Sequence, residues 1–365
     1  MQPILILGGY GNFGKRISLA LAKSKIPIII AGRNKNQAQA LSSEIHHHFP
    51  NTSIATACFD VNTDLDQQLK QHKPVAVVNT CGPFQTTDYR VAEQCIAHGV
   101  HYIDLADGRD FVTGITTLHE SALAQNTLVV SGASTVPSLS SAVLDHFQHE
   151  FSTINSLIFG ISPGQKAPRG IATTQAILSY TGKKLPPCAG NTKRYGWQGL
   201  YRQQYPELGN RWMADCDVPD LDLLPKRYDI RSIRFSAGME STPLHLGIWL
   251  LSWVIRAGIP LNLPRHASFL LKASNWFNWL GSDNGGMHII IRGTNPLGGP
   301  YERKWFIIAK HGDGPQIPTI PAIILAKRIA QNKEKLRGAH PCIGLVSLEE
   351  YLTELSEFSI TTHTQ

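Results

Sequence analysis

The chain has 365 residues, enough for two domains, and its 42% hydrophobic and 17% charged residues are typical of a globular protein and exclude a disordered one. Its net charge of +7 favours anionic ligands such as nucleotides, but no Lys/Arg block marks a nucleic-acid-binding tail, so we expect no nucleic-acid partner. The six cysteines form no CxxC pair and the N-terminus does not read as a secretion signal, which together predict a cytoplasmic protein without a metal site.

The first elements along the chain are a strand, a glycine loop, a helix and a second strand. Residues 4–7 form a short apolar run, which is typical of a strand buried on both faces of a parallel sheet. A helical pattern covers residues 15–22, and a second apolar strand covers residues 27–31. Between the first strand and the helix lies a match to the GxGxxG fingerprint of dinucleotide-binding domains, Gly9-Tyr10-Gly11-Asn12-Phe13-Gly14.

Each glycine of this loop has a predicted role. Gly9 permits a tight turn, Gly11 lets the backbone approach a pyrophosphate, and Gly14 lets the helix pack closely on the strand. The diphosphate would then be bound by free N–H groups at the helix N-terminus. A glycine-rich turn without a ligand is the alternative, and the position of the loop between strand and helix favours the phosphate site.

The residues after the second strand bear on the choice of nucleotide. An NAD site carries Asp or Glu there, whereas this strand ends in Gly32 and is followed by Arg33 and Asn34. A guanidinium pairs with a 2′-phosphate through two hydrogen bonds. We therefore predict NADP(H) as the cofactor, with a solvated surface arginine as the alternative.

The third strand is predicted over residues 54–61. Asp60, at its end, would either accept a hydrogen bond from the adenine amino group or cap the turn at residues 62–63. The preceding helix ends in three histidines, residues 46–48, which point in different directions on a helix and therefore predict a solvated helix end rather than a metal site.

The fourth and fifth strands bring polar residues to the same sheet edge. The fourth strand is predicted over residues 75–79 and ends at Asn79. It is followed by Thr80, Cys81, Gly82 and Pro83, whose backbone would lie against a nicotinamide ring. The fifth strand, residues 101–105, contains Asp104, and Asp107 follows it. With a sixth strand over residues 127–132, the pattern predicts an all-parallel, doubly wound Rossmann sheet.

These stretches resemble the saccharopine dehydrogenase-like oxidoreductases. The resemblance rests on residues 8–14, 31–34, 78–84, 102–105 and 132–138, and more loosely on residues 314–322. It implies NADP(H) bound across residues 9–14, 33–34, 60 and 79–84, and a second α+β domain inserted after the sixth strand. We thus expect a Rossmann domain from residues 1–133 and 315–365, and a substrate or dimerisation domain with a mostly antiparallel sheet from residues 134–314. Saccharopine itself is not implied as the substrate.

The second half of the chain has weaker patterns. Residues 183–240 are rich in Pro, Gly, Asp and aromatics without a clear period, and we expect irregular connections there. Residues 288–293 and 301–308 predict a β-hairpin. Pro321 is placed in the first turn of a helix, and Ser347 with Glu350 forms a predicted capping box.

Residues 244–280 contain two apolar, tryptophan-rich helical patterns. The uncharged stretch from Leu246 to Ile255 is too short to span a bilayer, so no transmembrane segment is expected. The two patterns fit buried core or a homodimer face, an apolar pocket, or a peripheral membrane contact with Arg256, Arg265 and Lys272 as basic flanks.

Two functions are compatible with these features. The first is an NADP(H)-dependent oxidoreductase that transfers hydride to or from a C=N or C=O carbon of a small-molecule substrate, with Asp104 and Asp107 as candidates for proton transfer, followed by Cys81 and Tyr102. A structural role is the alternative for each candidate: Asp104 could pair with Arg109, Asp107 could cap a helix, and Cys81 could be packing. The second function is an NADP(H)-binding scaffold, or a protein associated with a membrane surface, without turnover.

Overall fold

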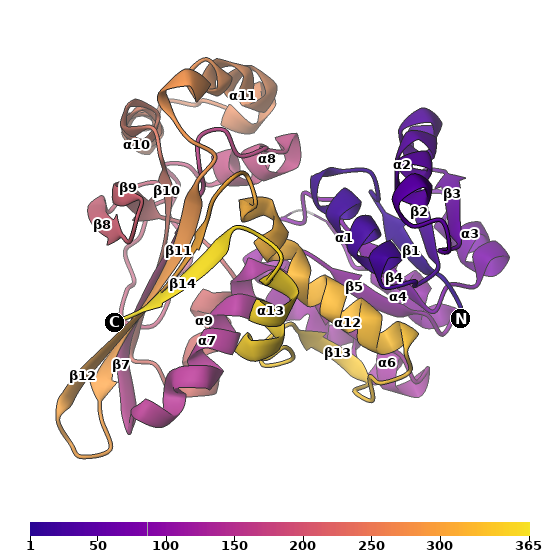
Figure 1. The fold of residues 1–365 in the computed structure, drawn as a ribbon. Helices are drawn as coiled ribbons and strands as arrows, with labels where there is room; N and C mark the ends of the chain where they lie inside the picture. The colour runs from indigo at the N-terminus through magenta and orange to yellow at the C-terminus, as the bar shows by residue number, and fades with distance from the viewer. Residues whose placement is uncertain (86) are drawn as a thin grey trace. The chain divides into compact units, whose positions relative to one another are not determined.

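The computed structural model describes residues 1–85 and 87–365, which form two units (Figure 1). The first unit contains Met1–Leu139 and Gln316–Tyr351, and the second contains Ser140–Pro315 and Leu352–Gln365. The sequence placed residues 352–365 in the first unit. They lie in the second because β14 (Ile360–Thr364) pairs with a strand of the second sheet.

The first unit is a Rossmann domain. Its seven parallel strands have the order β13-β6-β5-β4-β1-β2-β3. In chain order they are β1 (Ile4–Leu7), β2 (Ile28–Gly32), β3 (Ile54–Cys58), β4 (Ala76–Asn79), β5 (His101–Asp104), β6 (Leu128–Ser131) and β13 (Gly338–Pro341). The order reverses between β1 and β4, and in open parallel sheets ligands bind beside such a reversal, outside the carboxyl ends of the strands. The predicted doubly wound sheet is confirmed, with β13 as an additional seventh strand.

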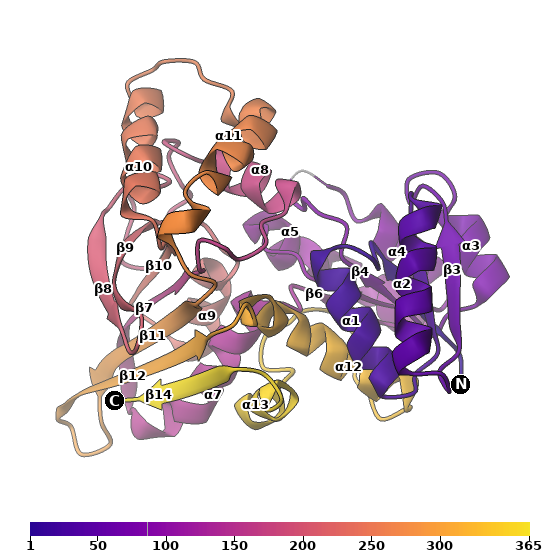
Figure 2. The same ribbon diagram turned by 45° about the horizontal axis from the view of Figure 1, so that its top comes forward.

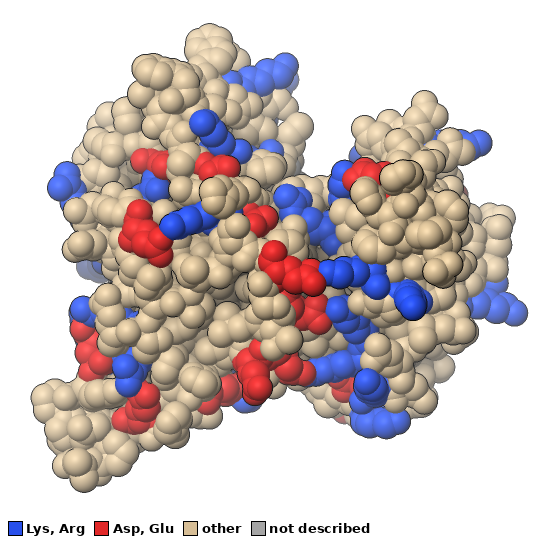
Figure 3. Space-filling view, viewed as in Figure 1, with Lys and Arg blue, Asp and Glu red and all other residues tan. Residues whose placement is uncertain are grey.

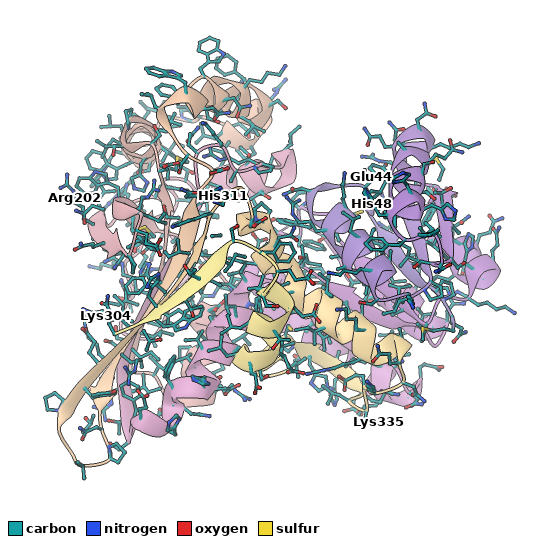
Figure 4. All side chains as sticks on the ribbon, viewed as in Figure 1. Glu44, His48, Arg202, Lys304, His311 and Lys335 are labelled. Carbon is teal, nitrogen blue, oxygen red and sulfur yellow. The ribbon has the colours of Figure 1, made fainter. Side chains whose placement is uncertain are left out.

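Helices cover both faces of this sheet, which explains the unbroken apolar runs of its strands. Leu5 and Leu7 belong to a core cluster with residues of α3 and α4, whereas Ile4 and Ile6 are equally buried. The helices are α1 (Asn12–Lys23), α2 (Lys35–His48), α3 (Leu65–His72), α4 (Arg90–Ala97), α5 (Arg109–Gly114), α6 (His119–Ala124) and α12 (Ile320–Ala330), and α13 (Leu348–Leu355) begins in this unit. His46 to His48 are exposed at the end of α2, where Figure 4 labels His48.

The second unit is built on a mixed sheet with the order β14-β12-β11-β7-β10-β9-β8. All neighbours are antiparallel except β7 and β10, so the expected mostly antiparallel sheet is confirmed. The strands besides β14 are β7 (Thr153–Ser162), β8 (Tyr201–Tyr205), β9 (Gly209–Asp215), β10 (Ser232–Met239), β11 (Gly285–Thr294) and β12 (Pro300–Ala309). The helices are α7 (Ser140–Phe147), α8 (Ile171–Ser179), α9 (Asp220–Tyr228), α10 (Thr242–Arg256) and α11 (Ala267–Asn275).

Three local predictions for the second half are confirmed and one is wrong. β11 and β12 form the hairpin, Pro321 lies in the first turn of α12, and Ser347 and Glu350 exchange the two hydrogen bonds of a capping box. The expectation of irregular structure over residues 183–240 is wrong, because β8, β9, α9 and β10 lie there. The strand pattern is hidden because β8 contains no aliphatic residue and because Arg211 and Asp215 occupy buried positions of β9.

Candidate functional site: the carboxyl edge of the Rossmann sheet

The glycine loop makes a tight turn from β1 into α1. Gly8 has a left-handed backbone (φ 72°), and the Gly11 N–H donates to the Gly8 carbonyl at 2.8 Å. A Cβ at position 14 would lie 2.1 Å from that same carbonyl oxygen, so only glycine fits there. The predicted close packing at Gly14 is therefore present, whereas the residue that needs a positive φ is Gly8 and not Gly9.

The N-terminus of α1 is open to an anion. Its N-cap is Gly11, and no side chain caps the helix. The first N–H groups of a helix have no partner within the helix, and the helix dipole favours negative charge beside them. The loop therefore fits the pyrophosphate of a dinucleotide, with N–H groups of Asn12, Phe13 and Gly14 as donors.

The Tyr10 side chain joins this loop to the end of β2. Its ring lies so close to Gly32 that a Cβ there would be 2.5 Å from ring atoms. Its hydroxyl accepts a hydrogen bond from the Asn34 N–H at 2.8 Å, while the Asn34 side chain caps α2 by accepting from the Gln37 N–H. Tyr10 and Asn34 thus fix the backbone that carries Arg33.

Arg33 itself is exposed, and among residues 1–85 and 87–365 its guanidinium has no hydrogen-bond partner. This free cation at the end of β2 fits a 2′-phosphate. Asp60 is different, because its carboxylate accepts from the backbone and side-chain N–H groups of Asn62. These two hydrogen bonds correspond to the cap of the turn at residues 62–63, which was one of the two roles considered for Asp60 from the sequence.

The segment after β4 packs directly on the glycine loop. The Thr80 hydroxyl donates to the Leu7 carbonyl at 2.8 Å, and a Cβ on Gly8 would lie 2.7 Å from that hydroxyl oxygen. Asn79 is buried, and its amide donates to the Tyr102 hydroxyl and accepts from the Cys81 N–H. The Gly82–Pro83 peptide that follows is cis. Asn79 and Thr80 therefore position the backbone of residues 81–83 beside the phosphate loop.

Two of the nominated catalytic residues are poorly suited to proton transfer. The Cys81 thiol is exposed, but desolvation by neighbouring protein atoms raises its pKa to about 11, so it stays protonated at neutral pH. Burial likewise raises the pKa of Tyr102 well above its usual value. Neither group would act as a base near neutral pH.

The carboxylate of Asp104 is buried and hydrogen-bonded to the ends of two neighbouring strands. It is completely buried, and one carboxylate oxygen accepts from the N–H groups of Ala106 and Gly132 and from the Ser131 hydroxyl, each at 2.9 Å. These bonds join the ends of β5 and β6. Burial raises the pKa of Asp104 to about 6, with the hydrogen bonds acting in the opposite direction. The pairing of Asp104 with Arg109 stays a prediction.

Asp107 is the exposed carboxyl group of this edge. It accepts a hydrogen bond from Gln85 Nε2 at 2.9 Å, and no side chain caps the helix that follows. Desolvation by surrounding protein atoms raises its pKa, against the hydrogen bond from Gln85. Of the four candidates, Asp107 alone is both accessible and oriented by a neighbour.

Comparison with known proteins finds a family model that matches the Rossmann domain. The family model described as "Saccharopine dehydrogenase NADP binding domain" matches residues 4–143. The resemblance found in the sequence is therefore confirmed, and the cofactor of this domain is NADP(H).

Solved structures extend the likeness over the chain. Apo saccharopine dehydrogenase (L-Glu forming) from Saccharomyces cerevisiae matches with a TM-score of 0.66 and 12% identity over 100% of both chains. An amine dehydrogenase from Mycobacterium smegmatis matches with a TM-score of 0.47 and 11% identity over 93% of this chain and 94% of that one. A search of curated proteins found no match. The yeast enzyme shows that the whole chain has the saccharopine dehydrogenase fold.

Three further residues at this edge of the sheet were not singled out from the sequence. Gly32 admits the Tyr10 ring, and Gln85 orients Asp107. Lys35, the first residue of α2, places a second exposed cation beside Arg33. A signal for Lys35 was present in the sequence, since it lies two residues after Arg33. Gly32 and Gln85 depend on contacts between separate loops.

Proposed function

We propose that the protein is an NADP(H)-dependent oxidoreductase that transfers hydride to or from a carbon doubly bonded to oxygen or nitrogen. The proposal is supported chiefly by one juxtaposition: the edge that carries the phosphate-binding loop also carries Asp107, an exposed carboxyl group that Gln85 orients. A hydride acceptor needs both a cofactor and a proton donor, and a donor works best when its pKa is moved towards the working pH.

The residues of the chain would divide the work as follows. The first N–H groups of α1 hold the pyrophosphate, and Arg33 and Lys35 hold the 2′-phosphate. The backbone of residues 81–83, fixed by Asn79 and Thr80, orients the nicotinamide and shields it from water. NADPH supplies the hydride when bound.

Asp107 would donate or remove the proton that accompanies hydride transfer. In the reducing direction the substrate carbon gains hydride, the C=O or C=N π bond breaks, and its oxygen or nitrogen takes a proton from the Asp107 carboxylic acid. In the oxidising direction the Asp107 carboxylate removes that proton while the carbon loses hydride. Gln85 acts as a positioning residue, because its Nε2 donates to Asp107 and turns the carboxyl group.

The test is NADPH oxidation over a panel of apolar ketones and of keto acids combined with amino acids, with Asp107→Asn and Asp110→Asn as a matched pair. Both carboxylates are exposed and lie three residues apart. We expect Asp107→Asn to lower kcat by about 10²- to 10³-fold, the usual contribution of a general acid. Asp110→Asn should match the parent protein.

NADPH affinity is measured in the same samples and should be unchanged by either substitution. Turnover that survives Asp107→Asn would remove Asp107 from the mechanism. Tight NADPH binding without turnover on any substrate of the panel would favour the scaffold function instead.

A further inference from the structure

Helix α10 of the second unit has an inverted polarity. It buries His245 and Ser252 completely, whereas Leu250, Trp253 and Val254 are 57%, 44% and 36% exposed. A helix at a water-facing surface normally shows the opposite arrangement, with polar residues outside. The exposed side of α10 is therefore adapted to an apolar surrounding.

The segment after α10 extends this surface. Phe269 and Trp276 of α11 and the following Trp279 and Leu280 are 70%, 80%, 78% and 53% exposed. Figures 1 and 2 place α10 and α11 at the same end of the second unit, and ring-bearing side chains project from that end in Figure 4. We call these exposed side chains, Leu250, Trp253, Val254, Phe269, Trp276, Trp279 and Leu280, the apolar face.

The charged residues of the segments that form and adjoin the apolar face are all basic. No Asp or Glu occurs between Glu240 and Asp283, or between Glu150 and Glu207, the stretch that contains α8. Exposed cations within these stretches include Lys183, Lys184, Arg265 and Lys272. The turn that precedes Lys183 packs on α10, since a Cβ on Gly182 would lie 2.3 Å from the Ser252 carbonyl oxygen. In Figure 3 this end of the unit is mostly uncharged, with blue basic residues among the tan.

This charge pattern distinguishes between the possible occupants. A twofold dimer would place the face against its own copy, so that Arg265 and Lys272 would meet cations without a carboxylate from these segments to neutralise them. An anionic lipid surface supplies the missing negative charge together with an apolar layer. Exposed Trp and Phe beside Lys and Arg on short helices are the composition of interfacial segments.

We propose that the apolar face docks the protein on an anionic lipid membrane, with Trp276 and Trp279 at the level of the lipid headgroups and Arg265 and Lys272 against the lipid phosphates. The contact is peripheral: within residues 1–85 and 87–365, every helix is too short or too polar to cross a bilayer. The inference does not depend on the proposed enzyme function.

The experiment is flotation of the full chain with phosphatidylcholine vesicles, with and without phosphatidylserine, at low and high salt. The parent protein should float with the anionic vesicles at low salt and much less at high salt, because salt screens the cations. Trp276→Ser/Trp279→Ser should lower the partition coefficient by about tenfold or more, since two large apolar side chains are lost. Arg265→Glu/Lys272→Glu should lower it by a similar factor or more.

Matched controls separate this surface from general effects of apolarity and charge. Leu297→Ser removes an apolar side chain that is 95% exposed in the β11–β12 turn, and Lys226→Glu/Lys333→Glu makes the same change of charge elsewhere. Both controls should float like the parent protein, and all variants should keep the parent circular dichroism and NADPH affinity. Failure of the parent to bind anionic vesicles would overturn the proposal. So would equal losses in the controls, or a concentration-dependent dimer in sedimentation that Trp276→Ser/Trp279→Ser abolishes.

Discussion

The carboxyl edge of the Rossmann sheet and the apolar face of α10 and α11 use buried and exposed groups in opposite ways. At the sheet edge, the buried side chains of Asn79 and Asp104 accept hydrogen bonds from backbone N–H groups, and no side chain caps the first N–H groups of α1. On α10, His245 and Ser252 are buried beside Ile248, whereas Leu250, Trp253 and Val254 are exposed. The first arrangement fits a small, highly polar ligand, and the second fits an extended apolar one.

The two regions also differ in the structural feature that marks each of them as functional. At the sheet edge each motif residue is explained by a specific contact, such as Gly14 against the Gly8 carbonyl. The apolar face contains no motif, and its evidence is the mismatch between side-chain type and exposure. An exposed tryptophan has no meaning alone, whereas several on one surface without acidic residues indicate a partner of definite chemistry.

Replacing Gly11 tests the sheet edge with the largest expected effect. A Cβ at this position lies in allowed backbone and 3.1 Å from the Gly8 carbonyl oxygen, so Gly11→Val should fold while covering the N-terminus of α1. We expect affinity for both NADPH and NADH to fall by at least about a hundredfold, because two or more charge-assisted hydrogen bonds are lost. Binding is followed by cofactor fluorescence, with circular dichroism as the check on folding. Unchanged affinity would mean that the loop is only a turn.

The pH dependence of stability tests whether Asp104 is structural. Its pKa in the folded protein, about 6, lies above 3.8, the ordinary value for Asp, so the folded state binds the proton more tightly and loses stability as pH rises from about 4 to 7. The shift corresponds to about 3 kcal/mol. Asp104→Asn lacks this ionisation, so its free energy of unfolding relative to the parent should rise by roughly that amount between pH 4 and 7. Urea denaturation at several pH values measures it, and a difference independent of pH would contradict the assignment.

Much of the first unit could be predicted from sequence because its signals are local. A buried parallel strand is an apolar run, and the turn into α1 requires glycines at fixed spacing. Strand β13 was missed because its residues, Gly338 to Pro341, contain no apolar run and become a strand only through pairing with β6. Strand β8, Tyr201–Tyr205, was missed for a similar reason, since polar residues occupy it and β9 supplies its hydrogen bonds.

The site was less predictable because its decisive contacts join distant loops. Gln85 and Asp107 are brought together by β4 and β5, and the Tyr10 ring reaches Gly32 across two strands. The apolar face could not be predicted either, because a helix that is apolar on several sides does not reveal which side is buried. Of the alternatives left open for residues 244–280, buried core does not describe Trp276 and Trp279, which are largely exposed.

Arg33→Asp tests the choice of nucleotide. Because the guanidinium is exposed and unpartnered in the described part of the chain, its replacement should leave the fold intact. NADPH affinity should fall by about tenfold to a hundredfold through loss of a charge-assisted pair and added repulsion of the 2′-phosphate, with little change for NADH. Titration of both nucleotides against both proteins measures this, and equal losses for the two nucleotides would refute the 2′-phosphate assignment.

The smallest expected effect concerns α10 and sharpens the contrast between the two regions. Leu250→Ser/Val254→Ser should change the free energy of unfolding by less than about 0.5 kcal/mol, because both side chains face away from the core. Ile248→Ser, on the buried side of the same helix, should cost about 2 kcal/mol or more. Urea denaturation at two protein concentrations measures the free energy of unfolding of both variants and of the parent protein. A loss well above 1 kcal/mol for the exposed pair that grows with concentration would mean that a second copy covers this side of α10, and the lipid surface would then be the wrong partner.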